Sequence, residues 1–277
     1  MHSDGALTPT AVVEAAAAAG VRLLALTDHD STGGVAEAAR AAVRERIRLV
    51  AATEISAVDE GRQDLHILGY LIDPDHPALV AELERSRRDR EARALGMVAA
   101  LERLGFAVDL EPLRARIARG ESVGRPHVAQ AVIRRPENRD RLAAADLLEP
   151  SAFLVEYLVE GRPAFVARSA PGVAEAISLI HAAGGLAVWA HPFWDIDAAE
   201  EVLATLERFR ALGIDGVEAY YVTHTERQSR LLARRAAELG LLTTGSSDFH
   251  GPRHRIFNRF RAFSTYDLEP TLGPIAG

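Results

Sequence analysis

Short apolar runs alternate with amphipathic helical stretches over most of the chain, a pattern that predicts parallel strands joined by crossover helices. The predicted fold class is therefore α/β. A helix is expected from Pro9 to Gly20, with Thr8 as its N-cap and Pro9 in its first position. The other elements predicted before residue 74 are strands over residues 21–26, 47–53 and 65–72 and a helix over 34–46.

The same alternation returns in the last third of the chain, where glycines mark the ends of helices. Gly184, Gly213 and Gly240 each follow an amphipathic stretch. The elements predicted there are helices over residues 173–183, 198–212 and 225–239 and strands over 186–190, 217–221 and 241–244.

The pattern changes in the middle of the chain. Between residues 76 and 167, helical patterns follow one another without a clear strand between them, and arginine is frequent. This change predicts a helical insertion that interrupts the α/β domain. The expected organisation is a first α/β part over residues 1–74, a helical insertion subdomain over 75–167 and a second α/β part over 168–277.

Composition narrows the class of protein. Of the 277 residues, 48% are apolar and 26% charged, which is typical of a globular chain with one large domain or one domain carrying an insertion. Cysteine is absent, which excludes disulfide scaffolds, thiolate nucleophiles and Cys-type zinc sites. All 32 basic residues are arginines, which excludes Schiff-base lysines and the lysine-bridged metal pair of an amidohydrolase.

The formal net charge of −7 argues against nucleic-acid binding by broad neutralisation of the phosphate backbone. No stretch reaches the roughly 20 uninterrupted apolar residues that a membrane-spanning helix needs. The N-terminus also shows no secretory signal. We therefore expect a cytoplasmic protein with no membrane association and no stable protein partner.

Titratable side chains gather at the ends of the predicted strands. Because the carboxyl ends of parallel strands meet on one face of an α/β fold, we expect these side chains to converge. Imidazoles and carboxylates, without Cys or Lys, form sites for divalent Zn, Mn or Fe. The pattern therefore predicts a site for two or more ions. The residues that follow strands are His29, Glu54, His191, Asp248 and His250.

Each of these residues alone has an ordinary structural explanation. A single His after a strand is more often a hydrogen-bonded structural residue than a ligand. Taken alone, Glu54 is explained as a partner in an ion pair, and Asp248 as a capping residue. Five such positions at the same phase of the strand–helix repeat favour a metal site, and residues 246–250 hold too many polar groups for a simple turn.

Six short segments, taken in order, resemble the motifs of the PHP superfamily, the polymerase and histidinol phosphatase phosphoesterases. They span nearly the whole chain, and their combination is far more specific than any one of them. The segments are Ser3-Asp4-Gly5 with Leu7-Thr8-Pro9, Thr27-Asp28-His29-Asp30, Glu54-Ile55-Ser56, His66-Ile67-Leu68-Gly69, Ala190-His191-Pro192 and Ser247-Asp248-Phe249-His250.

The resemblance implies a distorted (β/α)7 TIM-like barrel with a centre of up to three divalent ions, Mn, Zn or Fe. In this arrangement Glu54 would bridge two ions. We expect a catalytic group formed by Asp4, His29, Glu54 and His191. The positions that match the family's metal ligands are Asp4, His29, Glu54, His66, His191, Asp248 and His250.

The start of the chain departs from the family pattern. Family members open with a strand that ends in His-x-His, five and seven residues before the aspartate that corresponds to Asp4, whereas only three residues precede Asp4 here. We expect a start codon assigned too far downstream, which truncates the first strand and removes two ligands. The alternative is that His2 is the second histidine of a shortened loop.

The predicted insertion holds candidates for substrate binding. Arg87, Arg90 and Arg93 recur every third residue on a predicted helix. Interspersed acidic residues support an ion-paired solvated helix as the alternative, but Arg also suits bidentate phosphate recognition. The segment Gly124-Arg125-Pro126-His127 is similar to the Arg-x-His segment by which relatives with this insertion contact substrate. The expected substrate-binding residues are Arg90, Arg93, Arg125 and His127.

Clustered divalent ions suit phosphoester hydrolysis, because they lower the pKa of water, supply hydroxide near neutral pH and neutralise phosphate oxygens. Glu54 and Asp248 would hold ions, and Asp4 would assist proton transfer through its ligand water. A remote phosphate held by Arg would orient the scissile one over the metals.

The insertion resembles that of the bacterial PHP subgroup that removes the 3′-phosphate of nucleoside 3′,5′-bisphosphates and, in some members, trims short RNA from its 5′ end. The expected substrate is therefore a nucleotide or short oligonucleotide. One departure is the segment Phe193-Trp194-Asp195, which replaces the subgroup's usual Gly-Arg after the His-Pro pair. The alternatives are a histidinol-phosphate phosphatase and a metal-depleted relative that binds nucleotides without catalysis.

Overall fold

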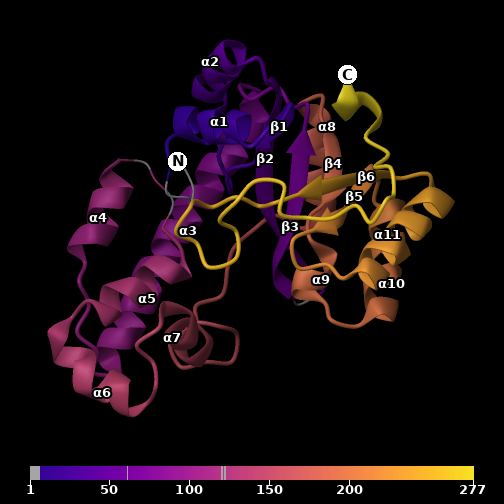
Figure 1. Cartoon of the computed structure of the whole chain (residues 1–277). Coiled ribbons are helices and arrows are strands. Elements are labelled where there is room, and N and C mark those ends of the chain that lie inside the picture. The colour runs from indigo at the N-terminus through magenta and orange to yellow at the C-terminus, as the bar shows by residue number, and fades with distance from the viewer. Residues whose placement is uncertain (1–6, 61, 120, 122) are drawn as a thin grey trace. The chain divides into compact units, whose positions relative to one another are not determined.

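The computed structural model describes residues 7–60, 62–119, 121 and 123–277. In these residues, six strands form one sheet in the order of the sequence, and helices pack against it (Figure 1). This arrangement confirms the α/β class. The strands are β1 (Leu23–Leu26), β2 (Arg48–Asp59), β3 (Arg62–Tyr70), β4 (Leu186–Trp189), β5 (Gly216–Tyr221) and β6 (Leu242–Ser246).

The expectation of a wholly parallel sheet is wrong for β3. This strand pairs antiparallel with both of its neighbours, β2 and β4, whereas β1–β2, β4–β5 and β5–β6 are parallel pairs. Only two residues separate Asp59, the last residue of β2, from Arg62, the first of β3. A two-residue connection closes a hairpin but is too short for the crossover that a parallel pair needs.

Five of the helices that flank the sheet begin and end close to the predicted positions, and the two short ones, over 192–195 and 273–276, were not predicted. The side chain of Thr8 accepts a hydrogen bond from the backbone N–H of Ala11, and Pro9 occupies the first turn, so the predicted N-cap of α1 is confirmed. No helix in the described ranges has both the length and the apolar character needed to cross a membrane. These helices are α1 (Pro9–Ala18), α2 (Val35–Glu45), α8 (Val173–Ala182), α9 (Pro192–Asp195), α10 (Ala199–Ala211), α11 (Glu226–Leu239) and the 3₁₀ helix η2 (Gly273–Ala276).

The chain divides into two compact units. Among the described residues, one unit contains the sheet and comprises residues 7–84 and 170–277, and the other, Arg85–Ser169, is helical. Their boundary falls within α3, and the predicted insertion limits, 75–167, remain a prediction. The elements between β3 and α8 are α3 (Pro77–Arg103), α4 (Glu111–Ala118), α5 (Arg125–Ile133), the 3₁₀ helix η1 (Pro136–Asn138), α6 (Arg139–Ala144) and α7 (Pro150–Tyr157).

The helical unit has its own apolar core. Met97, Leu101, Leu113 and Phe153 are among its fully buried side chains. The buried Asn138 amide donates to the carbonyl oxygens of Ala107 and Val132 at 2.7 and 2.8 Å, and so satisfies backbone groups between helices. Such a core allows the unit to bury its apolar surface without a sheet.

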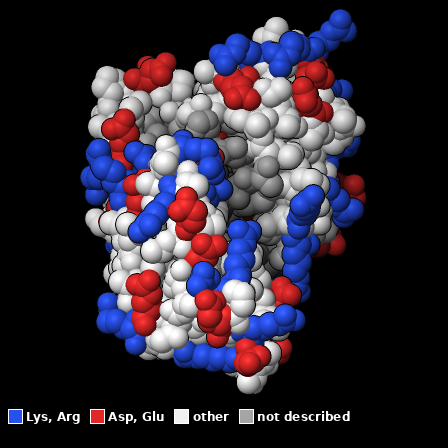
Figure 2. Space-filling view, turned by 90° about the vertical axis from the view of Figure 1, so that its left-hand side faces the viewer, with Lys and Arg blue, Asp and Glu red and all other residues white. Residues whose placement is uncertain are grey.

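Charged side chains of both signs are interspersed on the face shown in Figure 2, rather than separated into a basic and an acidic patch. Several arginines pair locally with acidic residues. Arg87 contacts Glu91 one helical turn away, and Arg119 donates to Glu121. Exposed pairs of this kind each contribute only about 0–1 kcal/mol.

The two faces of the sheet have different partners. On one face, Ile55, Ile67 and Trp189 pack against apolar residues of α8, α10 and α11. On the other face, Val50, Ala52, Leu68 and Val188 form a second cluster, to which Ile275 of η2 adds. Because side chains alternate along a strand, Glu54 and His66 share this second face, near the middle of their strands. The apolar residues of this face pack together and so stabilise β2 and β3, the strands that carry Glu54 and His66.

Candidate metal centre

His29 lies in the loop that follows β1, as predicted. The loop continues to pair with β2, since Asp30 N–H donates to the Glu54 carbonyl at 2.8 Å and Glu54 N–H donates to the Asp28 carbonyl at 3.2 Å. The buried Asp30 carboxylate also accepts the backbone N–H and the hydroxyl of Ser56, at 2.9 and 3.0 Å. These bonds fix the His29 ring 3.7 Å from Glu54, measured from Nδ1 to Oε2.

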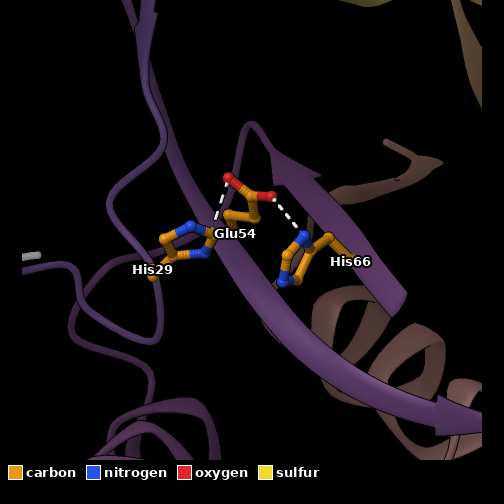
Figure 3. Close-up of side chains that lie close together, drawn as sticks. All are labelled: His29, Glu54 and His66. Carbon is orange, nitrogen blue, oxygen red and sulfur yellow. Dashed lines mark ion pairs between the residues drawn. The ribbon is translucent and has the colours of Figure 1, made fainter. Parts of the chain in front are cut away.

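Glu54 lies within β2 and not after it, because β2 extends to Asp59 through its hairpin pairing with β3. His66 lies within β3, opposite Ser56, so Glu54 and His66 are diagonal neighbours on one face of the sheet. His66 Nδ1 lies 3.1 Å from Glu54 Oε1. Figure 3 shows the imidazoles of His29 and His66 approaching the Glu54 carboxylate from two sides.

His191 follows β4 directly and brings a third imidazole to the same carboxylate. Its Nε2 lies 3.3 Å from Glu54 Oε1 and 3.2 Å from His66 Nδ1. Its backbone is left-handed, with φ 29° and ψ 57°, which is a strained conformation for a non-glycine residue before proline. The buried Glu218 of β5 stabilises this conformation, because its Oε2 accepts the His191 N–H at 3.0 Å.

These donors fit a divalent ion. One ligand atom from each of His29, Glu54 and His66 lies within 4.8 Å of the others. In a tetrahedral site, imidazole nitrogens and carboxylate oxygens lie about 2.0–2.1 Å from the ion. Two neighbouring ligand atoms are then about 3.4 Å apart. The separations of 3.1 and 3.3 Å from Glu54 Oε1 to His66 and His191 are close to that value. The donors are all nitrogen and oxygen, as the sequence predicted.

The imidazoles and the carboxylate also stabilise one another electrostatically. Burial acts to raise the pKa of Glu54, but the neighbouring His29 and His191 outweigh it, and the pKa is lowered. Burial opposes protonation of His191, but hydrogen bonding to Asp195 and Glu54 outweighs it and raises the pKa of His191. A divalent cation bound here would also offset the negative charge of the buried Glu54 carboxylate.

Asp248 and His250 follow β6, as predicted, and form a second group. The Tyr221 hydroxyl donates to Asp248 Oδ2 at 2.6 Å, and the Tyr221 ring lies 5.3 Å from the ring of His191. His250 Nδ1 bonds the Asp248 carbonyl at 2.7 Å. Tyr221 therefore connects this group to the three-imidazole cluster.

Five further residues were predicted for the site. Asp4 lies outside the described residues. Arg90, Arg93, Arg125 and His127 belong to the helical unit, where the buried Arg93 donates from Nε to the Val166 carbonyl at 2.8 Å and His127 Nδ1 accepts the Gly124 N–H at 3.0 Å. Their role toward a substrate remains a prediction.

The sequence analysis did not identify Asp30, Glu218 or Tyr221. Glu218 left a visible signal, since it is the one charged residue in the apolar run of β5. Burial acts to raise its pKa, to about 8, despite the neighbouring His191. Asp30 also left a signal, because it stands in the segment Thr27-Asp28-His29-Asp30. Tyr221 resembled an ordinary buried strand residue.

Residues 1–212 match the model of the PHP domain. The chain belongs to the PHP family. A 3′,5′-nucleoside bisphosphate phosphatase of Chromobacterium violaceum is 38% identical over 274 residues, which cover 99% of this chain and 91% of that protein. A 5′-3′ exoribonuclease of Haemophilus influenzae is 36% identical over 250 residues, covering 90% and 87%.

A solved structure from Bifidobacterium adolescentis, assigned as a metal-dependent phosphoesterase, is similar to this PHP chain with a TM-score of 0.79 and 29% identity, covering 96% of this chain and 90% of that one. The predicted family and the α/β fold are thus confirmed. This PHP protein is a hydrolase of phosphoric esters, and its His29–Glu54–His66 group is suited to a metal ion.

Proposed function

We propose that this PHP protein removes the 3′-phosphate of nucleoside 3′,5′-bisphosphates in a reaction that requires divalent metal. The convergence of three imidazoles on the Glu54 carboxylate carries this proposal. The C. violaceum relative, named for this activity, supports the substrate. A metal-depleted binding protein would not need to hold four such donors in contact.

We assign the metal ligands to Asp4, His29, Glu54, His66, His191, Asp248 and His250, for up to three ions of Mn, Zn or Fe. Bound divalent ions lower the pKa of water and neutralise phosphate oxygens. Among the protein groups, Glu218 holds the backbone of His191 and Tyr221 orients Asp248. We assign the catalytic group to Asp4, His29, Glu54 and His191.

We assign recognition of a second phosphate to Arg90, Arg93, Arg125 and His127, which extends the sequence prediction. The guanidinium of Arg93 is fixed by Val166 and lies 5.6 Å from the Phe165 ring, an arrangement that limits its motion. A positioned guanidinium loses less entropy when it binds phosphate than a mobile one does. We also propose that the six strands belong to the distorted (β/α)7 barrel that the family resemblance implies.

A second candidate is 5′-3′ exoribonuclease activity. The observation that favours it is the 36% identity to the H. influenzae exoribonuclease over most of both chains. Short 5′-phosphorylated RNA is therefore a necessary test substrate. Histidinol phosphate is another, because it separates a nucleotide phosphatase from the rival within the superfamily.

The test uses the full chain loaded with Mn²⁺ or Zn²⁺ and measures phosphate release from three phosphomonoesters and mononucleotide release from RNA. The substrates are adenosine 3′,5′-bisphosphate, adenosine 5′-monophosphate, histidinol phosphate and 5′-phosphorylated RNA. We expect the bisphosphate to be hydrolysed with the highest kcat/KM. Faster hydrolysis of histidinol phosphate than of the bisphosphate, or hydrolysis of none of the four substrates, would refute the proposal.

The metal assignment is tested with Glu54→Gln and His66→Ala. Each should lower kcat/KM roughly 100-fold or more, since even residues behind metal ligands typically cost 10–100-fold. Elemental analysis should show fewer bound ions per chain. His76→Ala is the matched control, because His76 lies in the loop before α3 and outside the cluster. Wild-type metal content in both cluster variants would overturn the assignment.

A further inference from the structure

The two tryptophans of the chain have opposite environments. Trp189 of β4 has 0% of its surface exposed and packs against Phe209, with ring centroids 5.0 Å apart. Trp194 of α9 is 50% exposed, only three residues after His191. A large aromatic ring that is half exposed so near a candidate metal centre is accessible to a bound ligand.

Other aromatic rings hold Trp194 in place. Its ring centroid lies 5.5 Å from that of Phe257 and 6.4 Å from that of Tyr221. Phe257 is buried and stacks on His254, with centroids 5.0 Å apart and planes inclined by 20°. Trp194 is therefore supported on one side by packed rings while half of its surface remains accessible to a ligand.

The same rings contact the candidate metal ligands. Tyr221 packs against His191 and donates to Asp248, and Phe257 lies 5.3 Å from the ring of His250. Only one side chain separates Trp194 from His191 and Asp248. A molecule whose phosphate reaches the metal ligands therefore has its neighbouring groups close to Trp194.

The chemistry around this cluster suits an anionic aromatic ligand. Residues 251–263 contain five arginines or histidines and no acidic residue, and Arg253, Arg255 and Arg259 are exposed. A flat exposed indole stacks on bases of any sequence, because every base has a π face. Nucleotides combine such a face with phosphate.

We propose that Trp194 is a stacking surface for the base of the nucleotide substrate and so determines specificity for nucleotides over phosphate esters without a base. This inference rests on the proposed phosphatase function and deepens it. Trp194 is a specificity residue and not a catalytic one, because its ring holds the base while the phosphate lies at the metal ligands.

Tryptophan fluorescence tests base stacking without any catalysis. Adenosine 5′-monophosphate and ribose 5-phosphate are titrated into the metal-loaded protein, so that the two probes differ in the base. We expect the monophosphate to quench the emission and ribose 5-phosphate to leave it unchanged. Trp194→Phe, which retains only the buried Trp189, should lose the quenching. Equal responses to both probes, or quenching that persists in Trp194→Phe, would overturn the inference.

Kinetics provide the second readout. Trp194→Ala should raise KM for adenosine 3′,5′-bisphosphate about 10-fold with little change in kcat, as expected for loss of one stacked base. Trp194→Phe should restore most of the affinity, and the inhibition constant of ribose 5-phosphate as a competitor of the bisphosphate should not change. Leu212→Ala, which shortens an exposed apolar side chain at the end of α10, is the matched control.

The two proposals fail in distinguishable ways. Absence of phosphate release from every ester would refute the phosphatase function, while the quenching experiment would still decide whether Trp194 binds bases. An equal rise of KM for the nucleotide and of the inhibition constant for ribose 5-phosphate would show a purely structural role for Trp194. Thermal unfolding of each variant confirms that the protein compared is folded.

Discussion

At the scale of the residue, Glu54 organises the candidate centre. It is buried in β2, and its two oxygens face His29 on one side and His66 with His191 on the other. A buried carboxylate without compensating charge would cost several kcal/mol. The buried negative charge of Glu54 is therefore stabilised by the surrounding imidazoles or by ions bound between them.

A different buried imidazole gives a prediction for pH. Burial lowers the pKa of His224 to about 4, although its Nδ1 lies 3.2 Å from the Ala219 carbonyl. The unfolded chain, with an ordinary His pKa of 6.5, binds this proton first as the pH falls. The contribution of neutral His224 to stability is therefore complete above pH 6.5 and is lost as the pH falls from 6.5 toward 4.

His224→Asn keeps a donor for the Ala219 carbonyl and does not titrate. Between pH 7 and pH 5, we expect the wild-type free energy of unfolding to fall by roughly 2 kcal/mol more than that of the variant, at about 1.4 kcal/mol per pH unit below 6.5. Urea unfolding in the presence of a chelator measures the difference. Equal losses in both proteins would contradict the assignment of a neutral buried His224.

The sequence predicted the residue types at the centre better than their surroundings. His29, Glu54 and His191 were expected to converge because strand ends meet, and the structure brings them into contact. Glu218 is visible in the sequence as the one charged residue of an apolar run, but its contact with His191 was missed. Its partner is a backbone N–H, which any residue at position 191 except proline would supply, so a sequence pattern cannot reveal the bond.

At the scale of the element, strand positions were predictable within about three residues, except that β2 runs to Asp59 and not to residue 53, and strand direction was not predictable. Apolar periodicity marks which residues are buried and says nothing about the partner strand. The short connection between Asp59 and Arg62 was the available signal for a hairpin. This hairpin extends β2 beyond Glu54 and places His66 diagonally opposite Glu54.

The pairing of β4 with β5 gives a prediction at this scale. β5 presents Glu218 to the His191 N–H at the end of β4, where the backbone is left-handed. Glu218→Leu would leave this buried N–H without an acceptor, which costs about 1–3 kcal/mol. We expect lower thermal stability and a weaker affinity for metal, as measured by unfolding and by metal titration.

Glu218→Gln is the matched variant, because its amide oxygen accepts the same hydrogen bond without the carboxyl group. We expect its metal affinity to stay within a few-fold of wild type. If both variants bind metal equally poorly, the charge of Glu218 and not its bond to His191 is what matters, and the positioning role is wrong.

At the scale of the whole molecule, the donors that meet at Glu54 come from both sides of the helical unit in the sequence. His29, Glu54 and His66 precede it and His191 follows it. The two parts meet where β3 pairs with β4, from Ile67 with Trp189 to Tyr70 with Leu186. An ion bound to both parts would resist their separation.

Metal removal should therefore lower the stability of the whole protein. An ion present at 100 times its Kd contributes about 2.7 kcal/mol, which corresponds to a Tm change of roughly 5–10 °C for a chain of this size. We expect a chelator to lower Tm by this amount, as measured by circular dichroism. His191→Ala should show a much smaller response, and an equal one would contradict a shared site.

The pairing of β3 with β4 also determines when the sheet can be completed during synthesis on the ribosome. When residues 62–70 have emerged, they can pair with β2, but their second partner, β4, has not been translated, since the whole helical unit comes first. During that interval β3 presents an open edge on a growing polypeptide. The complete triad of imidazoles exists only after His191 has left the exit tunnel.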